Sequence, residues 1–126
     1  MIKQIPSKEI EEYLKNNPNC VLLDVRTEEE WNNDGKPDGE KIGLKTYFLS
    51  LQFSDASYNE NFDEEFNKLN IKKNCEILTM CMGGVRSQIA AEIIEKKDYK
   101  CANISDGFLG NKKEKVGWKK NDLPWR

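Results

Sequence analysis

Short apolar runs along the chain alternate with longer segments whose apolar residues recur every three or four positions. The apolar runs predict β-strands over residues 2–5, 20–25, 45–51, 76–80 and 101–104. Helical spacing predicts helices over residues 7–16, from Thr27 through Trp31, over 61–69 and over 86–97. The continuous apolar character of residues 20–25 is typical of a strand buried on both faces of a parallel sheet.

The polar residues predict where these elements begin and what joins them. Ser7 is expected to cap the first helix, and Thr27 with Glu30 has the spacing of a capping box for the second. Residues 33–43 are rich in Gly, Pro, Asp and Lys and predict an exposed loop. The tail, 106–126, is expected to be irregular and held down by apolar anchors at Phe108, Trp118, Leu123 and Trp125.

Strands that alternate with helices predict an α/β fold with a central, mostly parallel sheet flanked by helices on both faces. The 126 residues suit one domain, and no linker or repeat divides 1–126. Ligands bind such sheets at the carboxyl ends of the strands. Cys81, residues 24–26 and residues 105–107 all lie at the carboxyl ends of strands, so we expect one rim built from three distant segments.

The most informative segment is residues 76–94, where an apolar run leads into Cys81, then Gly83 and Gly84, then Arg86 at the start of a helical pattern. A thiol at a helix N-terminus ionises more readily, because unpaired N–H groups and the helix dipole favour negative charge there. Two glycines allow the loop to turn successive N–H groups inward. An inert core cysteine followed by a simple turn is the alternative interpretation, but the unbroken order favours a reachable cysteine nucleophile.

Composition excludes several classes of function. Lys and Arg total 20, Asp and Glu total 22, and the net charge of −2 gives no reason to expect nucleic acid or an anionic membrane as partner. No apolar stretch is long enough to span a membrane, and the first residues lack a secretory signal. The four cysteines do not have the spacing of a zinc site, so we expect no metal, and we expect no cofactor. Without a secretory signal, we expect a reducing, cytoplasmic location.

Histidine is absent from the chain. Its absence excludes Cys–His and Ser–His–Asp catalysis, so any activation of Cys81 must come from backbone amides, a helix end or a cation.

These segments resemble the rhodanese-like sulfurtransferases. Residues 81–87, Cys-Met-Gly-Gly-Val-Arg-Ser, resemble the family's C-x-x-G-x-R-S active-site loop. Residues 23–26 with Glu30 and Trp31 resemble its L-D-V-R…E-[WY] segment, and 103–108 its N-V-x-D-G-[GF] turn. The ending 117–125 is similar to the G-W…L-P close of single-domain members. The order is that of the family, and the likeness is weakest between residues 32 and 60.

The resemblance implies a two-step sulfur transfer through a Cys81 persulfide. A donor such as thiosulfate gives its outer sulfur to Cys81, and a thiophilic acceptor (cyanide, a thiol or a partner protein) removes it. The N–H groups of the loop would hold the persulfide, which makes the substrate-binding candidates Met82, Gly83, Gly84, Val85 and Ser87. Arg86 either supplies charge at the rim or braces the loop through a salt bridge to a neighbouring carboxylate.

Other residues are expected to support the site or the core. Asp24 and Arg26 predict a structural ion pair beneath the loop, and Asp106 is expected to fix its own turn by accepting backbone N–H groups. Packing roles are expected for the three other cysteines and for the tryptophans, namely Cys20, Cys75, Cys101, Trp31, Trp118 and Trp125.

Two alternatives stay open, a Cys-based phosphatase or arsenate reductase and a non-catalytic sulfur-relay or binding module. The phosphatase is disfavoured because four residues separate Cys81 from Arg86, whereas five wrap a phosphate in that class. The relay module would bind a partner through the 33–43 loop and the tail. The uncharged residues Met82, Gly83 and Val85 suggest weak binding of thiosulfate and a persulfide as the donor.

Overall fold

In a computed structural model that describes residues 1–126, five strands form one sheet in the order β1-β5-β4-β2-β3. The strands are β1 (Lys3–Ile5), β2 (Cys20–Asp24), β3 (Lys45–Phe48), β4 (Glu76–Met80) and β5 (Lys100–Ile104). Every neighbouring pair is parallel. The prediction of an α/β fold is confirmed, and the sheet is entirely parallel.

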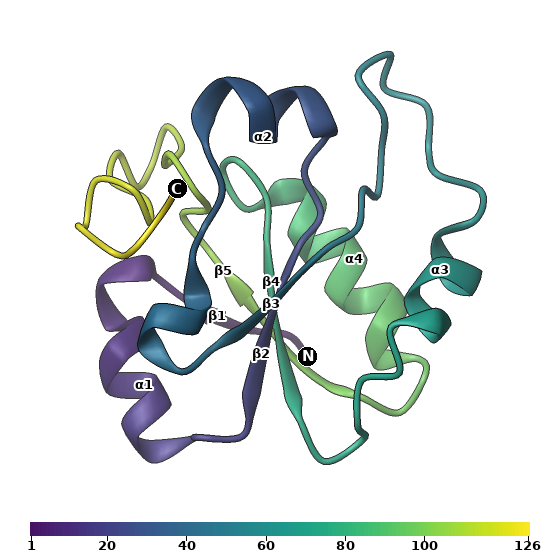
Figure 1. Ribbon diagram of the computed structural model, residues 1–126, viewed down its shortest axis with the longest axis horizontal. Helices are drawn as coiled ribbons and strands as arrows, with labels where there is room; N and C mark the ends of the chain where they lie inside the picture. Colours follow the sequence, from purple (N-terminus) through teal and green to yellow (C-terminus); the bar gives the residue numbers. More distant parts are fainter.

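Helices cover both faces of the sheet, as the sequence predicts. The α-helices are α1 (Ile10–Asn16), α2 (Glu28–Asp34), α3 (Phe62–Lys68) and α4 (Val85–Glu95), with short 3₁₀ turns η1 (Ser7–Glu9) and η2 (Gly39–Ile42). In Figure 1, α1 lies on one side of the sheet and α3 and α4 on the other, while α2 lies beyond the carboxyl ends of the strands. None of these helices has both the length and the apolar character needed to cross a membrane.

The sheet separates two hydrophobic cores. One core joins the side chains of α3 and α4 to Val21, Leu23 and Ile77 of the strands. The other joins α1 and the tail to Leu22, Leu78 and Met80. Alternate residues of β2 and β4 therefore enter opposite cores, which explains why these strands have no polar face.

The expected loop at 33–43 is only partly exposed, which corrects the sequence interpretation. It contains η2, and Pro37 forms an antiparallel bridge with Trp125. The Lys36 N–H donates to the Arg126 carbonyl at 2.7 Å, and the Arg126 N–H returns a bond to Lys36 at 2.8 Å. The tail therefore pairs with this segment through a short run of backbone hydrogen bonds. Local composition cannot reveal this pairing, because the two segments are far apart in the sequence.

The tail has no regular elements, as predicted, but its anchors differ in burial. Phe108 and Trp118 are fully buried, and the Trp118 indole N–H donates to the Pro124 carbonyl at 2.8 Å. Trp125 is 45% exposed and its ring lies 3.7 Å from the Lys119 ammonium. Trp125 is therefore a surface contact rather than a core anchor.

The first helix also begins differently from the prediction. Ser7 lies within η1 and caps no helix; its N–H and hydroxyl instead donate to the Asp106 carboxylate, at 2.9 and 2.7 Å. The Thr27–Glu30 capping box is present as predicted. The difference is that the Thr27 bonds are local in the chain, whereas the partner of Ser7 comes from the other end of it.

Candidate active site

Cys81 follows β4 directly and lies at the carboxyl end of the sheet. Its sulfur accepts a hydrogen bond from the Gly84 N–H at 3.1 Å and lies 3.3 Å from the Ser87 hydroxyl oxygen. Gly84 is the N-cap of α4, so the sulfur lies at the positive end of that helix. The predicted relationship between the cysteine, the glycines and the helix is present in the structure.

The carbonyl groups of residues 81–84 all accept hydrogen bonds from β5 and the segment that follows it. The Phe108 and Leu109 N–H groups donate to the carbonyls of Cys81 and Met82, at 2.9 and 3.1 Å. The side-chain amide of Asn111 donates to the Gly83 carbonyl at 2.6 Å, and that of Asn103 to the Gly84 carbonyl at 3.0 Å. Four successive carbonyls are thereby turned away from the cysteine.

Because the carbonyls point outward, the loop keeps its N–H groups unpaired. The backbone N–H groups of five loop residues donate no hydrogen bond to a protein acceptor, namely Met82, Gly83, Val85, Arg86 and Ser87. Unpaired N–H groups around a helix N-terminus form a site that favours an anion. Only the Gly84 N–H contacts the sulfur in this structure, so a ring of N–H donors around it stays a prediction.

Gly84 makes this loop geometry possible. Its φ of +104° is in the left-handed region, and a Cβ here would lie 2.2 Å from the Ser105 carbonyl oxygen. A glycine on the opposing segment has the same function, because a Cβ on Gly107 would lie 2.5 Å from the Cys81 carbonyl oxygen. The two glycines allow the segments to approach closely enough for the carbonyl bonds described above.

Arg86 forms a two-point salt bridge with Glu30 of α2. The two guanidinium nitrogens lie 2.7 and 2.8 Å from the two carboxylate oxygens. Burial of Glu30 opposes its ionisation, but the hydrogen bonds from Arg86 and Thr27 outweigh that cost and lower the pKa of Glu30 to about 2. The same salt bridge raises the pKa of Arg86. Of the two roles considered for Arg86, the geometry corresponds to bracing.

Asp24 and Arg26 form an ion pair that is fully buried. The Arg26 Nη2 atom lies 2.8 Å from Asp24 Oδ2 and 2.9 Å from the Gly35 carbonyl oxygen. The guanidinium also lies 4.2 Å from the centre of the Phe108 ring. The pair therefore joins β2, the end of α2 and the tail, as the prediction of a structural ion pair requires.

Asp106 does not fix its own turn in the way the sequence suggests. Its carboxylate accepts both bonds from Ser7, as described above, and so fastens the start of the chain to the end of β5. Burial raises the pKa of Asp106, although the bonds from Ser7 act in the opposite sense. Asp106 therefore belongs to the scaffold beneath the rim rather than to the sulfur's surroundings.

The structure corrects the expectation that Cys81 is reachable from solvent. The residue is 1% exposed and packs in the core beneath α4. A hollow of about 370 Å³, lined by α2, Phe53 and Arg86, lies on one side of the loop, and Cys81 is not part of its lining. A second hollow of about 480 Å³, beside Gly83 and Asn103, also excludes it. The Cys81 sulfur is therefore not open to solvent in this structure.

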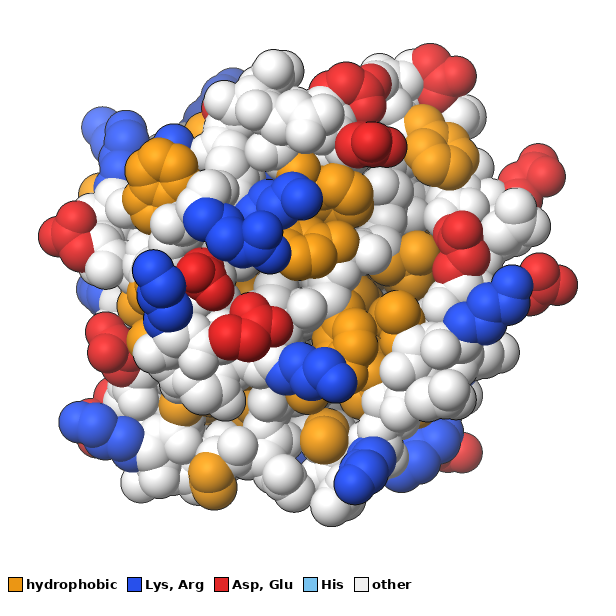
Figure 2. Space-filling model, viewed as in Figure 1, with side chains coloured by type: hydrophobic (Ala, Val, Ile, Leu, Met, Phe, Trp, Pro, Cys, Tyr) orange, Lys and Arg blue, Asp and Glu red, His pale blue; other side chains and the backbone are white.

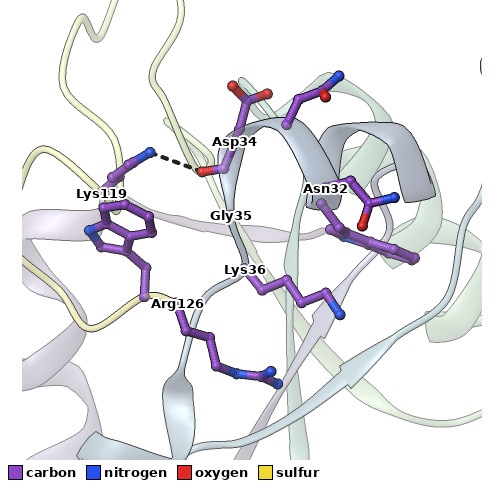
Figure 3. A pocket seen from close by; sticks show the side chains of 9 residues that line it. Asn32, Asp34, Gly35, Lys36, Lys119 and Arg126 are labelled. Atoms are coloured by element: carbon purple, nitrogen blue, oxygen red, sulfur yellow. Dashed lines mark hydrogen bonds between the residues drawn. The ribbon is translucent and has the colours of Figure 1, made fainter.

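A third hollow, of about 530 Å³, lies between the end of α2 and the tail (Figure 3). Its Lys119 ammonium donates to the Asp34 carbonyl at 2.9 Å and lies over the Trp125 ring. None of the residues that line it belongs to the loop at 81–87. On the face drawn in Figure 2, Lys and Arg side chains lie among Asp and Glu side chains, so no large patch of one sign stands out there.

The three other cysteines are away from this loop. Cys20 and Cys101 are buried, as predicted, and burial raises the pKa of each thiol to about 12. Cys75 is partly buried and packs against the core from the opposite end of β4.

Sequence reasoning missed three residues of the site: Glu30, Asn103 and Asn111. The sequence predicts Glu30 as a capping-box residue and as part of the E-[WY] segment, and neither pattern identifies Arg86 as its partner. Asn103 lies within β5 and Asn111 in the tail beyond it. A side-chain amide in either place carries no information about its hydrogen-bond partner.

Comparison with known proteins identifies the family. The model of the rhodanese-like domain matches residues 7–114, and the chain belongs to this family. RP600 of Rickettsia prowazekii is 43% identical in an alignment that covers 100% of this chain and 98% of that protein. The crystal structure of Rv0390 from M. tuberculosis is 33% identical, with a TM-score of 0.83 over 98% of this chain and 96% of that one. A rhodanese-like domain protein from Staphylococcus aureus shares the fold, at 21% identity and a TM-score of 0.68 over 99% of each chain.

Proposed function

We propose that this protein is a sulfurtransferase that carries a sulfane sulfur on Cys81. The observation that supports it is the Cys81 sulfur bonded to the Gly84 N–H at 3.1 Å, with the neighbouring N–H groups of the loop unpaired. Such donors stabilise a thiolate, and they also stabilise the anionic outer sulfur of a persulfide. The chemistry needs a reduced thiol, so we infer a reducing compartment, the cytoplasm, as its location.

Both chemical steps are displacements at sulfur. The Cys81 thiolate attacks the outer sulfur of the donor, the donor's S–S bond breaks, and the leaving group departs with the electron pair as sulfite or a thiolate. Cys81 then carries one extra sulfur as a persulfide anion. Cyanide or a thiolate attacks that outer sulfur and leaves with it, which returns Cys81 to the thiolate. Neither step needs a proton-transfer base, which suits a chain without histidine.

The charges around the loop favour a persulfide over thiosulfate as the donor. Arg86 is the one cation of the loop, and its guanidinium is engaged by both oxygens of Glu30. Glu28 and Glu29 precede Glu30 in the first turn of α2 and add negative charge beside it. A dianion such as thiosulfate would meet these carboxylates with no free cation in the loop to offset them. A thiol persulfide carries less charge and avoids much of this cost.

The same salt bridge argues against a phosphatase. A phosphate ester needs an arginine that is free to bind its oxygens, and the Arg86 nitrogens already bond Glu30 at 2.7 and 2.8 Å. The loop is also one residue shorter than a phosphate loop. A phosphate ester should therefore not be hydrolysed by the wild-type protein.

The mass of Cys81 after exposure to a donor tests the proposal. The protein is treated with a thiol persulfide or with thiosulfate, and the peptide that contains Cys81 is measured by mass spectrometry. We expect the gain of one sulfur on Cys81, faster with the persulfide, and none at this position in Cys81→Ser. Cys75→Ser is the matched control, because it removes a partly buried cysteine from the other end of β4 and should leave the gain unchanged. Absence of extra sulfur on Cys81 with every donor would overturn the proposal.

Release of the bound sulfur distinguishes the enzyme from the relay module. The loaded protein is mixed with cyanide, and the thiocyanate formed is followed over many turnovers. An enzyme returns to the thiolate and turns over repeatedly. A relay module would keep its sulfur until a specific partner is added.

A further inference from the structure

The Ser87 hydroxyl lies between two groups that compete for its single proton. Its oxygen is 2.5 Å from Asn103 Oδ1 and 3.3 Å from the Cys81 sulfur. Ser87 is fully buried and Asn103 is 2% exposed, so neither side chain has bulk water as an alternative partner. A hydroxyl has one hydrogen to donate and two lone pairs with which to accept. Which neighbour receives the hydrogen decides what Ser87 presents to the sulfur.

The orientation of the Asn103 amide settles that competition. Its Nδ2 group donates to the Gly84 carbonyl at 3.0 Å and to Gln4 Oε1 at 2.9 Å. A backbone carbonyl can only accept, so turning the amide over would set two acceptors against each other at Gly84. Asn103 Oδ1 must therefore face Ser87, and as an acceptor it takes the Ser87 hydrogen.

The direction of the hydrogen bonds extends to the surface. Gln4 Nε2 donates to Gln88 Oε1 at 2.6 Å, and Gln88 Nε2 donates to the Glu92 carboxylate at 3.3 Å. Each amide presents its oxygen toward the site and its nitrogen toward the surface. This series of hydrogen bonds therefore ends at the Glu92 carboxylate, which can only accept. The direction of the series agrees with the orientation of the Asn103 amide that the Gly84 carbonyl fixes.

We propose that Asn103 is a positioning residue for Cys81, because by holding the Ser87 proton it turns the Ser87 oxygen into an acceptor for the Cys81 S–H. The resting site then has two opposed contacts on one sulfur. The Gly84 N–H favours the thiolate, whereas Ser87 favours the thiol. Ionisation of Cys81 removes the S–H that Ser87 accepts, and its proton goes to solvent. This inference rests on the proposed role of Cys81 as the nucleophile.

Ionisable side chains of the segments that meet near the loop have hydrogen-bond partners within the protein. Arg86 of α4 is bonded to Glu30 of α2, and Asp24 at the end of β2 is bonded to Arg26. Asp106, in the turn after β5, accepts hydrogen bonds from Ser7. Glu28 and Glu29 lie beside Glu30 in α2. The substitutions proposed below leave all of these residues in place.

The pH dependence of Cys81 alkylation tests the proposal. The rate of carbamidomethylation at Cys81 is measured across pH by peptide mass spectrometry in the full-length protein, and the midpoint of the profile is compared among variants. We expect Ser87→Ala to lower the midpoint by about half a unit to one unit, because the thiol loses an acceptor. Asn103→Ala should lower it by about one unit, because the freed hydroxyl donates to the thiolate.

A double variant separates this role from general support of the loop. In the Ser87→Ala background, Asn103→Ala should cause no further change of the midpoint. Asn103→Ala removes the hydrogen bond to the Gly84 carbonyl with or without Ser87, so loss of loop support alone would lower or raise the midpoint equally in both backgrounds. Thr79→Val is the matched control, because the Thr79 hydroxyl lies 3.4 Å from the same Asn103 oxygen and does not contact the sulfur. Thr79→Val should leave the midpoint unchanged.

Three results would overturn the inference: a higher midpoint in Ser87→Ala, an unchanged one, or an equal effect of Asn103→Ala with and without Ser87. If Asn103→Ala does not fold, the sign of the change in Ser87→Ala decides the matter alone. The measurement needs no sulfur donor, so it gives its answer even if Cys81 forms no persulfide and the proposed function fails.

Discussion

The Arg86 guanidinium and the Glu30 carboxylate meet at two points, with nitrogen–oxygen distances of 2.7 and 2.8 Å. Both side chains are about three-quarters buried, at 22% and 23% exposure. Glu30 also accepts from the Thr27 N–H and hydroxyl, so one carboxylate caps α2 and holds the first turn of α4. The loop that carries Cys81 is thus fastened to the segment that follows β2.

Removal of the arginine charge should destabilise the fold more than removal of the carboxylate charge. Arg86→Met leaves Glu30 ionised and partly buried without its cation, and we expect a loss of about 1–3 kcal/mol in the free energy of unfolding. Glu30→Gln keeps a side-chain oxygen that accepts hydrogen bonds from Thr27, so it should lower the free energy of unfolding by less. Urea unfolding at neutral pH measures both, and equal losses would contradict the assigned geometry.

The stability of the protein should fall in acid through Glu30. Its pKa is lowered in the folded state from 4.5 to about 2, so the unfolded chain binds the proton more readily. The stabilisation is therefore complete above about pH 4.5 and is lost as the pH falls toward about 2. In a pH series of urea unfolding, the difference between wild type and Glu30→Gln should shrink across this window. A difference that stays constant across it would contradict the prediction.

Gly84→Ala should damage the site far more than the same change at Gly43. Both glycines have positive φ, at +104° and +79°, but a Cβ at Gly43 meets nothing within 4 Å. Gly43→Ala therefore reports backbone strain alone, about 1 kcal/mol. Gly84→Ala adds the collision with Ser105 and should cost about 2 kcal/mol more. It should also slow persulfide formation at Cys81 at least tenfold, whereas Gly43→Ala leaves that rate unchanged.

Asp24 and Arg26 should be strongly coupled in stability. Asp24→Leu leaves a guanidinium with no solvent exposure and no counter-charge, and we expect a loss of about 3–5 kcal/mol. The double change Asp24→Leu with Arg26→Met removes both charges and should be less destabilised than Asp24→Leu alone. A thermodynamic cycle of urea unfolding gives the coupling directly. Additive losses would show that the two side chains act independently.

The sequence alone predicts the strands, the helices, the capping box and the cysteine loop, because each depends on residues close together in the chain. Strands β2 and β4 contain short apolar runs, and the order from Cys81 to Ser87 predicts the turn into α4. The failures share a different cause. Ser7 caps no helix because Asp106 accepts its hydrogen bonds, and Pro37 is bridged because Trp125 lies beside it.

The same limit applies to the site. The cysteine, the glycines and the arginine could be predicted, but the bonds that orient them could not. Asn103 and Asn111 donate to loop carbonyls across about twenty to thirty residues of sequence, and no local pattern specifies such a pair. The burial of Cys81 depends on how the sheet and α4 pack together, which the local pattern does not specify.

The fastening of four loop carbonyls by residues 103–111 has a consequence for biosynthesis. A growing polypeptide that has emerged from the ribosome only as far as α4 already contains Cys81, Arg86 and Ser87, yet nothing holds the amides around the sulfur. These hydrogen bonds to the loop form only when the last strand and the turn beyond it have been made. Assembly of the loop therefore waits until residue 111 has been synthesised.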